Sequence, residues 1–310
     1  MKICVSEKLI FKKLIILWII SKIITLPLLW VNKLLETLDQ NQIIFFATVM
    51  ALTAIPVGFI AGLFGVGGGL ITVPVLFYIF NSMGLDKSFI MHLVVGTSFA
   101  IIIPTSFIST MTHMKFKAVD FDIVKSFGVF VVIGIIIGTI FAVILKTAHL
   151  ILFFSVLTML FAFYFLTSKE KTNTVKRKMN LTYKVILGFL SGFFIAPMGI
   201  GGGSINVPIL KIFGYSINKA IGSSAAIGFL VSIIGALGFA ISGTYINIEA
   251  PLSFGFVNIP AFLIFIPITM VMAKIGAIAV HKINRRIINR LFGVFLLKVS
   301  SSLFFEYLKF

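Results

Sequence analysis

Two glycine-rich stretches, GVGGG at residues 65–69 and GIGGG at residues 199–203, hold the residues best suited to binding a ligand. Each glycine costs about 1 kcal/mol relative to alanine inside a helix, so consecutive glycines should interrupt one. They also carry no side chain, so another backbone or a ligand can approach closely. Each stretch is followed by a proline, Pro74 or Pro208. The pattern predicts two backbone sites, each followed by a helix.

The expected helix starts indicate which ligand such a site would take. Proline is favoured in the first turn of a helix, which predicts that the two helices begin at Pro74 and Pro208. Unpaired N–H groups at a helix start carry partial positive charge and bind anions. Embedded hydroxyl and amide groups can donate further hydrogen bonds. The candidate substrate-binding residues are Gly67, Gly68, Gly69, Thr72, Pro74, Thr97, Ser98, Gly201, Gly202, Gly203, Asn206, Pro208, Ser223 and Ser224.

The acidic residues also favour an anion. There are nine Asp and Glu residues in all, and none lies deep inside a long apolar run. Carriers of cations or protons usually keep a carboxylate within the membrane, so that class is disfavoured. The single cysteine, Cys4, excludes an internal disulfide and a cysteine-based metal cluster. Neither motif continues to the Gly-Lys-Ser/Thr of a phosphate loop. We expect no cofactor, no metal site and no enzyme.

Composition points to the lipid bilayer. Hydrophobic residues make up 59% of the 310 positions and charged residues only 11%, whereas soluble domains carry about 25% charged residues. The net charge of +17 comes from Lys and Arg in short loops between apolar runs, which is typical of cytoplasmic loops. A nucleic-acid partner would need a continuous basic face, so it is not expected. The predicted class is a multi-spanning helical membrane protein.

The apolar runs divide the chain into four parts. Residues 1–41 are basic and amphipathic, and either an interfacial helix or an extra span from Leu14 fits them. A first membrane repeat follows at 42–167, then a basic cytoplasmic loop at 168–183 and a second membrane repeat at 184–306. The predicted membrane segments are 42–64, 70–83, 89–111, 123–145 and 150–167, then 183–198, 204–213, 218–242, 254–273 and 291–305.

The two halves are related by sequence. Gly-Phe-x-x-Gly precedes both motifs and Val-Pro follows both, while residues 96–98 (GTS) correspond to residues 222–224 (GSS). The basic loops at 169–178 and 282–290 should both be cytoplasmic. An odd number of segments then separates the two glycine motifs, so they should enter from opposite faces. The predicted fold is an all-α polytopic membrane helix bundle of two inverted-topology repeats, each with a glycine-broken helix.

The doubled Gly-x-Gly-Gly-Gly-x-x-x-Val-Pro pattern resembles the sulfite exporter TauE/SafE family of TSUP-type membrane permeases. The C-terminal residues Pro267, Gly276 and Ala279, with the basic run before Phe292-Gly293, are similar to that family as well. The resemblance covers roughly residues 43–305. It implies a multi-pass helix bundle in the cell membrane of a prokaryote. It also implies transport of small anions, chiefly sulfite, organosulfonates and related sulfur oxyanions, with the glycines and the two prolines at the site.

Two functions follow from these observations. The first is a permease or exporter of small anions, working by alternating access between two inverted repeats, with the anion between the glycine motifs. The alternative is a non-transporting membrane scaffold or assembly protein. Small residues in membrane helices often serve close helix packing, and the glycines would then have that role alone.

Overall fold

The computed structural model describes residues 40–65, 67–167, 179–246, 248, 250–280 and 285–309, except the side chains of residue 40 and residues 285–288. Residues 47–310 form one compact unit, while residues 40–46 belong to a second unit with the chain before them. The predicted N-terminal segment lies outside the described residues apart from its last two. The predicted basic loop at 169–178 also lies outside them, and that at 282–290 is described only in part.

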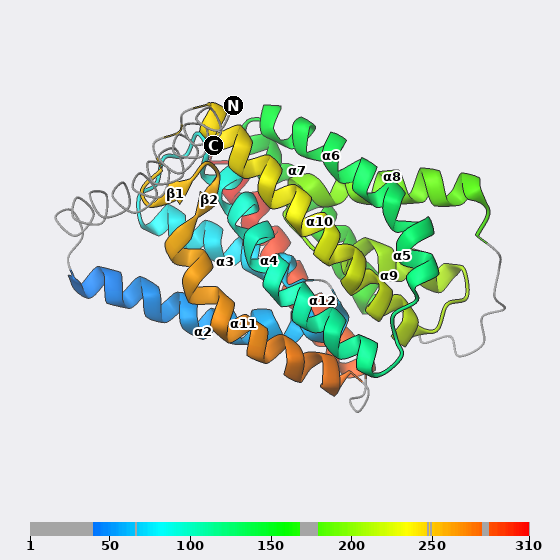
Figure 1. Cartoon of the computed structure of the whole chain (residues 1–310). Helices are drawn as coiled ribbons and strands as arrows, with labels where there is room; N and C mark the ends of the chain where they lie inside the picture. Colours follow the sequence, from blue (N-terminus) through cyan, green and yellow to red (C-terminus); the bar gives the residue numbers. More distant parts are fainter. Residues whose placement is uncertain are drawn as a thin grey trace, which may run out of the picture. The chain divides into compact units, whose positions relative to one another are not determined.

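The described residues are almost entirely helical, which confirms the all-α membrane class (Figure 1). Within the part of the chain that the structure describes, six helices are long and apolar enough to cross a membrane. In the first half the helices are α2 (Gln40–Phe64), α3 (Gly69–Ser82), α4 (Ile90–Lys115), α5 (Phe121–Ser126), α6 (Gly128–Ile144) and α7 (Thr147–Thr167). In the second half the elements are α8 (Leu181–Met198), α9 (Gly203–Ile212), α10 (Ile217–Tyr245), β1 (Ser253–Phe254), β2 (Val257–Asn258), α11 (Ile259–Ala279) and α12 (Arg285–Tyr307).

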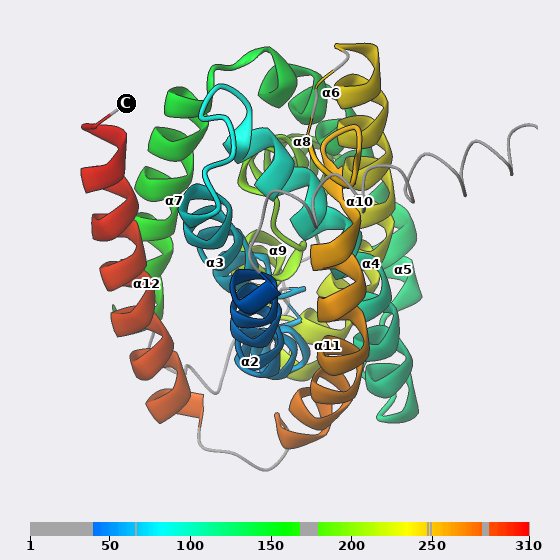
Figure 2. The ribbon, with the colours of Figure 1, turned by 90° about the vertical axis from the view of Figure 1, so that its left-hand side faces the viewer.

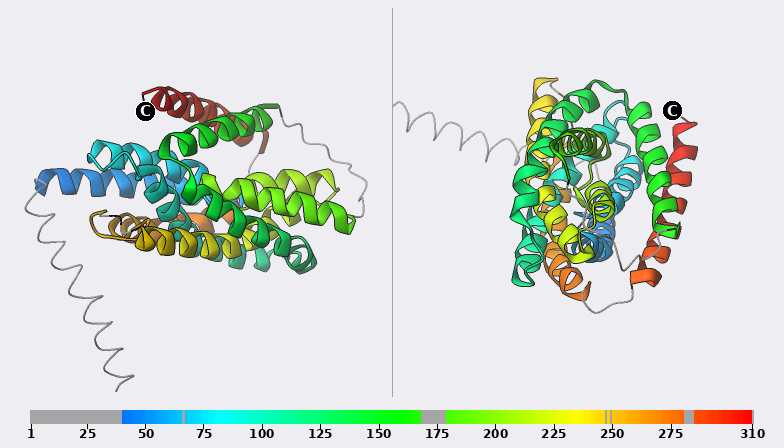
Figure 3. Two further views of the ribbon diagram at one scale, coloured as in Figure 1. Left: turned by 90° about the horizontal axis from the view of Figure 1, so that it is seen from above. Right: turned by 90° about the vertical axis from the view of Figure 1, so that its right-hand side faces the viewer.

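Helix α4 is the centre of the larger unit. In its most hydrophobic window 83% of the residues are buried, against 22% for α2. It packs against α10, α11 and α3, while α6 packs on α8 and α7 packs on α12. The short helices α3 and α9 lie between the longer ones (Figure 2). The two further views in Figure 3 show α7 and α12 side by side. The large side chains that face outward are mainly Ile, Leu, Phe and Val, as a lipid-facing surface requires.

Glycines bring two pairs of helices into backbone contact. On α6 and α8, a Cβ at Gly134 would overlap the carbonyl oxygen of Phe189, and one at Gly192 would overlap that of Val131. On α2 and α11, a Cβ at Gly62 would overlap the backbone of Ala273 in the same way. Small residues at such crossings let helices approach closely in membranes. These glycines therefore have a packing role.

Substitution of a packing glycine should destabilise the protein. We expect Gly192→Ala to force α6 and α8 apart and to lower the free energy of unfolding by about 1–3 kcal/mol, the usual range for overpacking. Gly128→Ala is the matched control, because its Cβ would meet only side-chain carbons, the nearest 3.2 Å away on Ile227. The measurement is thermal stability of both variants in detergent by size-exclusion chromatography. A Gly192→Ala protein as stable as the control would contradict the packing role.

The predicted segments at 254–273 and 123–145 differ from the observed helices. The segment expected from Phe254 begins as a short antiparallel β1–β2 hairpin that turns at Gly255, where φ is +54°. Helix α11 starts after it, because the Asn258 side chain accepts a hydrogen bond from Ala261 N and caps the helix. The single segment expected at 123–145 is divided at Phe127 into α5 and α6.

Candidate functional site

The first glycine motif is a turn between α2 and α3. Gly65, Gly67 and Gly68 all have positive φ, between +65° and +85°, a region that side-chain-bearing residues rarely adopt. The carbonyl oxygen of Gly68 accepts hydrogen bonds from Ile71 N and Thr72 N, which closes the first turn of α3. The helix thus starts at the glycines, and its first N–H groups have no partner within the helix.

The second glycine motif is a turn of the same kind between α8 and α9. Gly199 ends α8 in the left-handed conformation, with φ at +61°. Gly202 precedes α9 with an ordinary helical φ of −58°, and its carbonyl oxygen accepts a hydrogen bond from Asn206 N. Fewer glycines have a positive φ in the second motif than in the first.

The prediction that the helices begin at Pro74 and Pro208 is wrong. Both prolines are inside helices, since α3 starts at Gly69 and α9 at Gly203. The strong turn at the glycines allows a helix to start at once, and each proline then removes one backbone hydrogen bond in the second turn of its helix. The helix starts consequently lie within the glycine motifs themselves.

The structure brings the two motifs together. A Cβ at Gly69 would overlap the carbonyl oxygen of Gly199 and lie 2.6 Å from Ile200 Cα. A Cβ at Gly67 would lie 3.3 Å from Gly201 Cα. The turns that start α3 and α9, far apart in sequence, therefore meet backbone to backbone in the interior of the unit.

Polar side chains without partners surround this meeting point. The Ser106 hydroxyl of α4 is 3.1 Å from the Cβ position of Gly67 and 3.6 Å from that of Gly228. The Cβ position of Gly202 is 2.7 Å from Asn206 Nδ2 and 3.3 Å from Gly228 N. Ser106 Oγ and Asn206 Nδ2 are both buried and have no hydrogen-bond partner among the described residues. Because the two clusters share Gly228, they lie close together.

The orientation of the Asn206 amide is fixed by a neighbour. The Ser191 hydroxyl on α8 donates to Asn206 Oδ1, so the amide presents its NH2 group to Gly202. Two further hydroxyls, those of Ser204 and Ser224, are buried and unpaired within the described part of the chain. The available groups are thus hydroxyl and amide donors together with the N–H groups of two helix starts.

The hydroxyl groups of four predicted site residues make hydrogen bonds within the protein. The Thr72 hydroxyl donates to Gly68 O at 3.1 Å, and the Ser98 hydroxyl donates to Gly199 O at 2.7 Å. The Thr97 hydroxyl accepts from Asn258 N, and the Ser223 hydroxyl accepts from Asp120 N, both at 2.9 Å. These residues hold the motifs and the starts of α11 and α5 in position.

No carboxylate within the described residues is fully buried. The described acidic residues are all partly or fully exposed, and none is among the buried polar side chains. No group of His, Cys, Asp and Glu within the described residues could hold a metal ion. The local electrostatics are therefore set by hydrogen-bond donors and helix starts, which favour negative charge.

Sequence reasoning missed Ser106, Ser191 and Gly228. Ser106 lies outside any motif, within an apolar stretch of α4, and only the repeat offers a signal. In the register that pairs Gly96 with Gly222, Ser106 corresponds to Ser232, so both halves carry a serine at this place. Ser191 is the second of the two variable residues in the second Gly-Phe-x-x-Gly pattern, where the first pattern has Ala61.

The helices define a multi-pass membrane protein. Comparison with known proteins identifies its family: residues 50–303 match the model of the sulfite exporter TauE/SafE family. A probable membrane transporter protein of Haemophilus influenzae is 31% identical over 261 residues, 84% of this chain and 99% of that protein. The chain therefore belongs to the TauE/SafE family.

Two further relatives extend the comparison. A probable membrane transporter protein of Methanocaldococcus jannaschii is 26% identical over 80% of this chain and 90% of its own length. One of Bacillus subtilis is 24% identical over 83% and 97%. No solved structure matches this chain significantly. The family and these relatives, which are named as transporters and not as enzymes, make the protein a membrane transporter of the cell membrane.

Proposed function

We propose that the protein transports small sulfur oxyanions, sulfite or organosulfonates, and binds them where the two glycine motifs meet. The observation that carries the proposal is the cluster of unpaired, buried donors around the turns, which includes Ser106 Oγ and Asn206 Nδ2. A buried donor without a partner costs about 1–3 kcal/mol. A bound oxyanion, with several acceptor oxygens, would satisfy these groups together.

The chemistry of the cluster favours an anion over a cation. The Asn206 NH2 group can only donate hydrogen bonds, and the unpaired hydroxyls can donate as well, so together they suit an anion. The nearby carbonyl oxygens of Gly68 and Gly199 already accept hydrogen bonds. The starts of α3 and α9 add backbone N–H groups and partial positive charge. The family description, sulfite exporter, supports the sulfur oxyanions.

Corresponding contacts in the two halves support an inverted repeat. The Thr97 hydroxyl accepts from Asn258 N, and the equivalent Ser223 hydroxyl accepts from Asp120 N, at the same distance of 2.9 Å. Asn258 and Asp120 in turn cap the helices that follow them, α11 and α5. A local hydrogen-bond scheme repeated in this way is what a two-fold relation between the halves would produce.

The pairing of helices agrees with the same relation. Helix α2 packs on α11 through Gly58 and Gly62, and α8 packs on α6 through Gly188 and Gly192. Helix α4 packs on α10 and α7 on α12, each pair joining equivalent helices of the two halves. A site between inverted halves could open to each side in turn as the halves rock, the arrangement common in secondary transporters.

The test is counterflow of radiolabelled sulfite into liposomes loaded with unlabelled sulfite. Vesicles with the purified protein should accumulate label faster than protein-free vesicles. Taurine, sulfoacetate and sulfate, each supplied in excess, then rank the substrates. We expect at least one of the two organosulfonates, taurine or sulfoacetate, to slow sulfite counterflow.

The contrary outcome would favour the scaffold. If folded protein, verified by size-exclusion chromatography, exchanged none of these anions, the sulfur oxyanion proposal would fail. The glycines of the two motifs would then serve close helix packing, as the glycines at the α6–α8 and α2–α11 crossings do.

A further inference from the structure

Beyond the site, α4 carries a row of hydroxyl groups along one face. Ser109 and Thr110 follow Ser106 by three and four residues, and His113 follows it by seven, so the four side chains fall within one stripe of the helix. Ser106, Ser109 and His113 are at most 1% exposed. The row starts at the glycine motifs and runs toward the carboxyl end of α4, where His113 Nε2 is 3.3 Å from Gly62 O.

The hydroxyls of this row differ from the others on α4. Thr97, Thr105 and Thr112 face other directions, and each donates to the carbonyl oxygen four residues earlier. Ser106, Ser109 and Thr110 make no such bond, and their buried hydroxyls have no partner among the described residues. Unsatisfied polar groups cost several kcal/mol at membrane depth. Water or a solute that reached this face would satisfy the hydroxyls of the row.

The equivalent face of α10 is apolar beyond Ser232, the counterpart of Ser106, whose hydroxyl donates to Phe229 O. Contacts between the helices show that they run antiparallel, since Gly235 meets Phe99 and Gly228 meets Ser106. In the register that pairs Gly96 with Gly222, the counterparts of residues 109, 110 and 113 are Gly235, Ala236 and Phe239. A similar hydrogen bond follows both helices, because Ala118 N donates to His113 O and Phe256 N donates to Phe239 O. The second half has twelve more residues between the two partners than the first.

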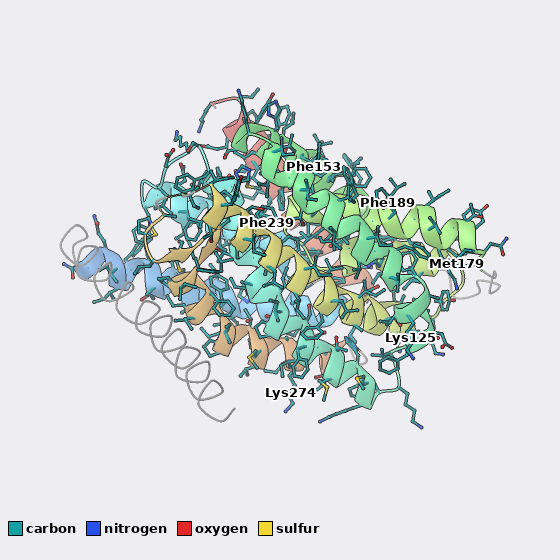
Figure 4. All side chains as sticks on the ribbon, turned by 45° about the horizontal axis from the view of Figure 1, so that its top comes forward. Lys125, Phe153, Met179, Phe189, Phe239 and Lys274 are labelled. Atoms are coloured by element: carbon teal, nitrogen blue, oxygen red, sulfur yellow. The ribbon has the colours of Figure 1, made fainter. Side chains whose placement is uncertain are left out.

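Aromatic rings close the α10 side. Phe99 and Phe239 are fully buried, with ring centroids 6.1 Å apart, and Phe239 meets Phe256 at 6.3 Å. The counterparts of Phe99 and Phe239 at the other end are small or polar, namely Ala225 and His113. Figure 4 labels Phe239 at one end of the bundle, with Lys125 and Lys274 toward the opposite end, where α4 finishes.

We propose that Ser106, Ser109, Thr110 and His113 line the route by which the anion passes between its site and the lysine-bearing end, and that Phe99 and Phe239 close the other end. This inference rests on the proposed function. Lys115, Lys117, Lys125 and Lys274 are exposed at the open end and attract anions to it. The positive-inside rule makes that end cytoplasmic.

Cysteine labelling tests the route directly. Cys4 is the only cysteine of the chain, so Cys4→Ser gives a cysteine-free background. Ser109→Cys and Thr110→Cys are then added singly, with Ala236→Cys as the matched control at the position equivalent to Thr110. The probe is the anionic, water-soluble reagent 2-sulfonatoethyl methanethiosulfonate, applied to the folded protein in liposomes. We expect residues 109 and 110 to react at least tenfold faster than residue 236, and excess methanesulfonate to slow them.

A second variant examines the aromatic barrier. Phe239→Ala, combined with Ala236→Cys, should raise the labelling rate at residue 236 at least tenfold. Equal rates at residues 110 and 236 in the background with Phe239, or unreactive cysteines at both 109 and 110, would overturn the route. Sulfite counterflow would in that case leave the proposed function standing. Fast labelling at 109 and 110 without protection by methanesulfonate, and without counterflow, would instead support a water path and overturn the anion function.

Discussion

Gly202→Ala should reduce anion transport at least tenfold while the protein still folds and inserts. The added methyl group would lie 2.7 Å from Asn206 Nδ2 and 3.2 Å from the Ser224 carbonyl oxygen, in the space that the anion would occupy. The backbone accepts alanine, because the φ of Gly202 is −58°. The Ser224 carbonyl oxygen and Gly228 N, at 3.3 Å, are backbone atoms, so the thermal stability of the variant is measured beside its transport. The measurement is initial counterflow rate per folded protein.

The control is again Gly128→Ala, which adds a methyl group near α10 but away from the motifs. It should transport at the unsubstituted rate. Gly68→Leu should eliminate transport as well, but the φ of +85° there strains any side chain. Gly202→Ala therefore separates occupation of the site from backbone distortion. Transport within twofold of the unsubstituted protein would exclude Gly202 from the site.

Asn206→Asp should have a still larger effect. The carboxylate can keep the hydrogen bond from Ser191, but it replaces the NH2 donor with an acceptor and adds negative charge. A like charge about 4 Å from a bound anion costs about 4 kcal/mol at an effective dielectric constant near 20. Since about 1.4 kcal/mol corresponds to a factor of ten, we expect transport at pH 7 to fall roughly a thousandfold.

The comparison variant is Asn206→Thr, because threonine occupies the equivalent position, Thr72, in the first half. It retains a hydroxyl donor and should lose much less activity than the aspartate variant. Lowering the pH should partly restore Asn206→Asp, since protonation removes the charge. Equal losses in both variants, with no recovery in acid, would assign the effect to shape and argue against an anion at this place.

Helix positions followed from the sequence wherever composition changes abruptly. The expected segments at 70–83 and 204–213 agree closely with α3 and α9, because glycines bound both at their starts. The start of α11 was missed because Phe254, Phe256 and Val257 continue the apolar pattern into a hairpin. The local signals there were Gly255 in the turn and the Asn258 cap, which hydropathy does not register.

The site was accessible from sequence only in part. Spacing identified the glycines, but it could not show which hydroxyls would already have hydrogen-bond partners within the protein, as at Thr97 and Ser223. Those bonds reach backbone N–H groups far along the chain, so they depend on the tertiary arrangement. Ser106 was not found for the same reason, since its place beside Gly67 arises from the crossing of α4 and the first motif.

The backbone contact between the two motifs also limits which substitutions the chain can accept. No side chain fits at Gly69, because a Cβ there would overlap the Gly199 carbonyl oxygen and Ile200 Cα. Gly199 is constrained separately, by its φ of +61° and by Val95 Cα, 3.0 Å from its Cβ position. The positions around the motifs differ between the two halves, with Ala61 and Thr72 in one and Ser191 and Asn206 in the other. Substitutions that adjust the site are therefore expected at these neighbouring positions and not at the two glycines.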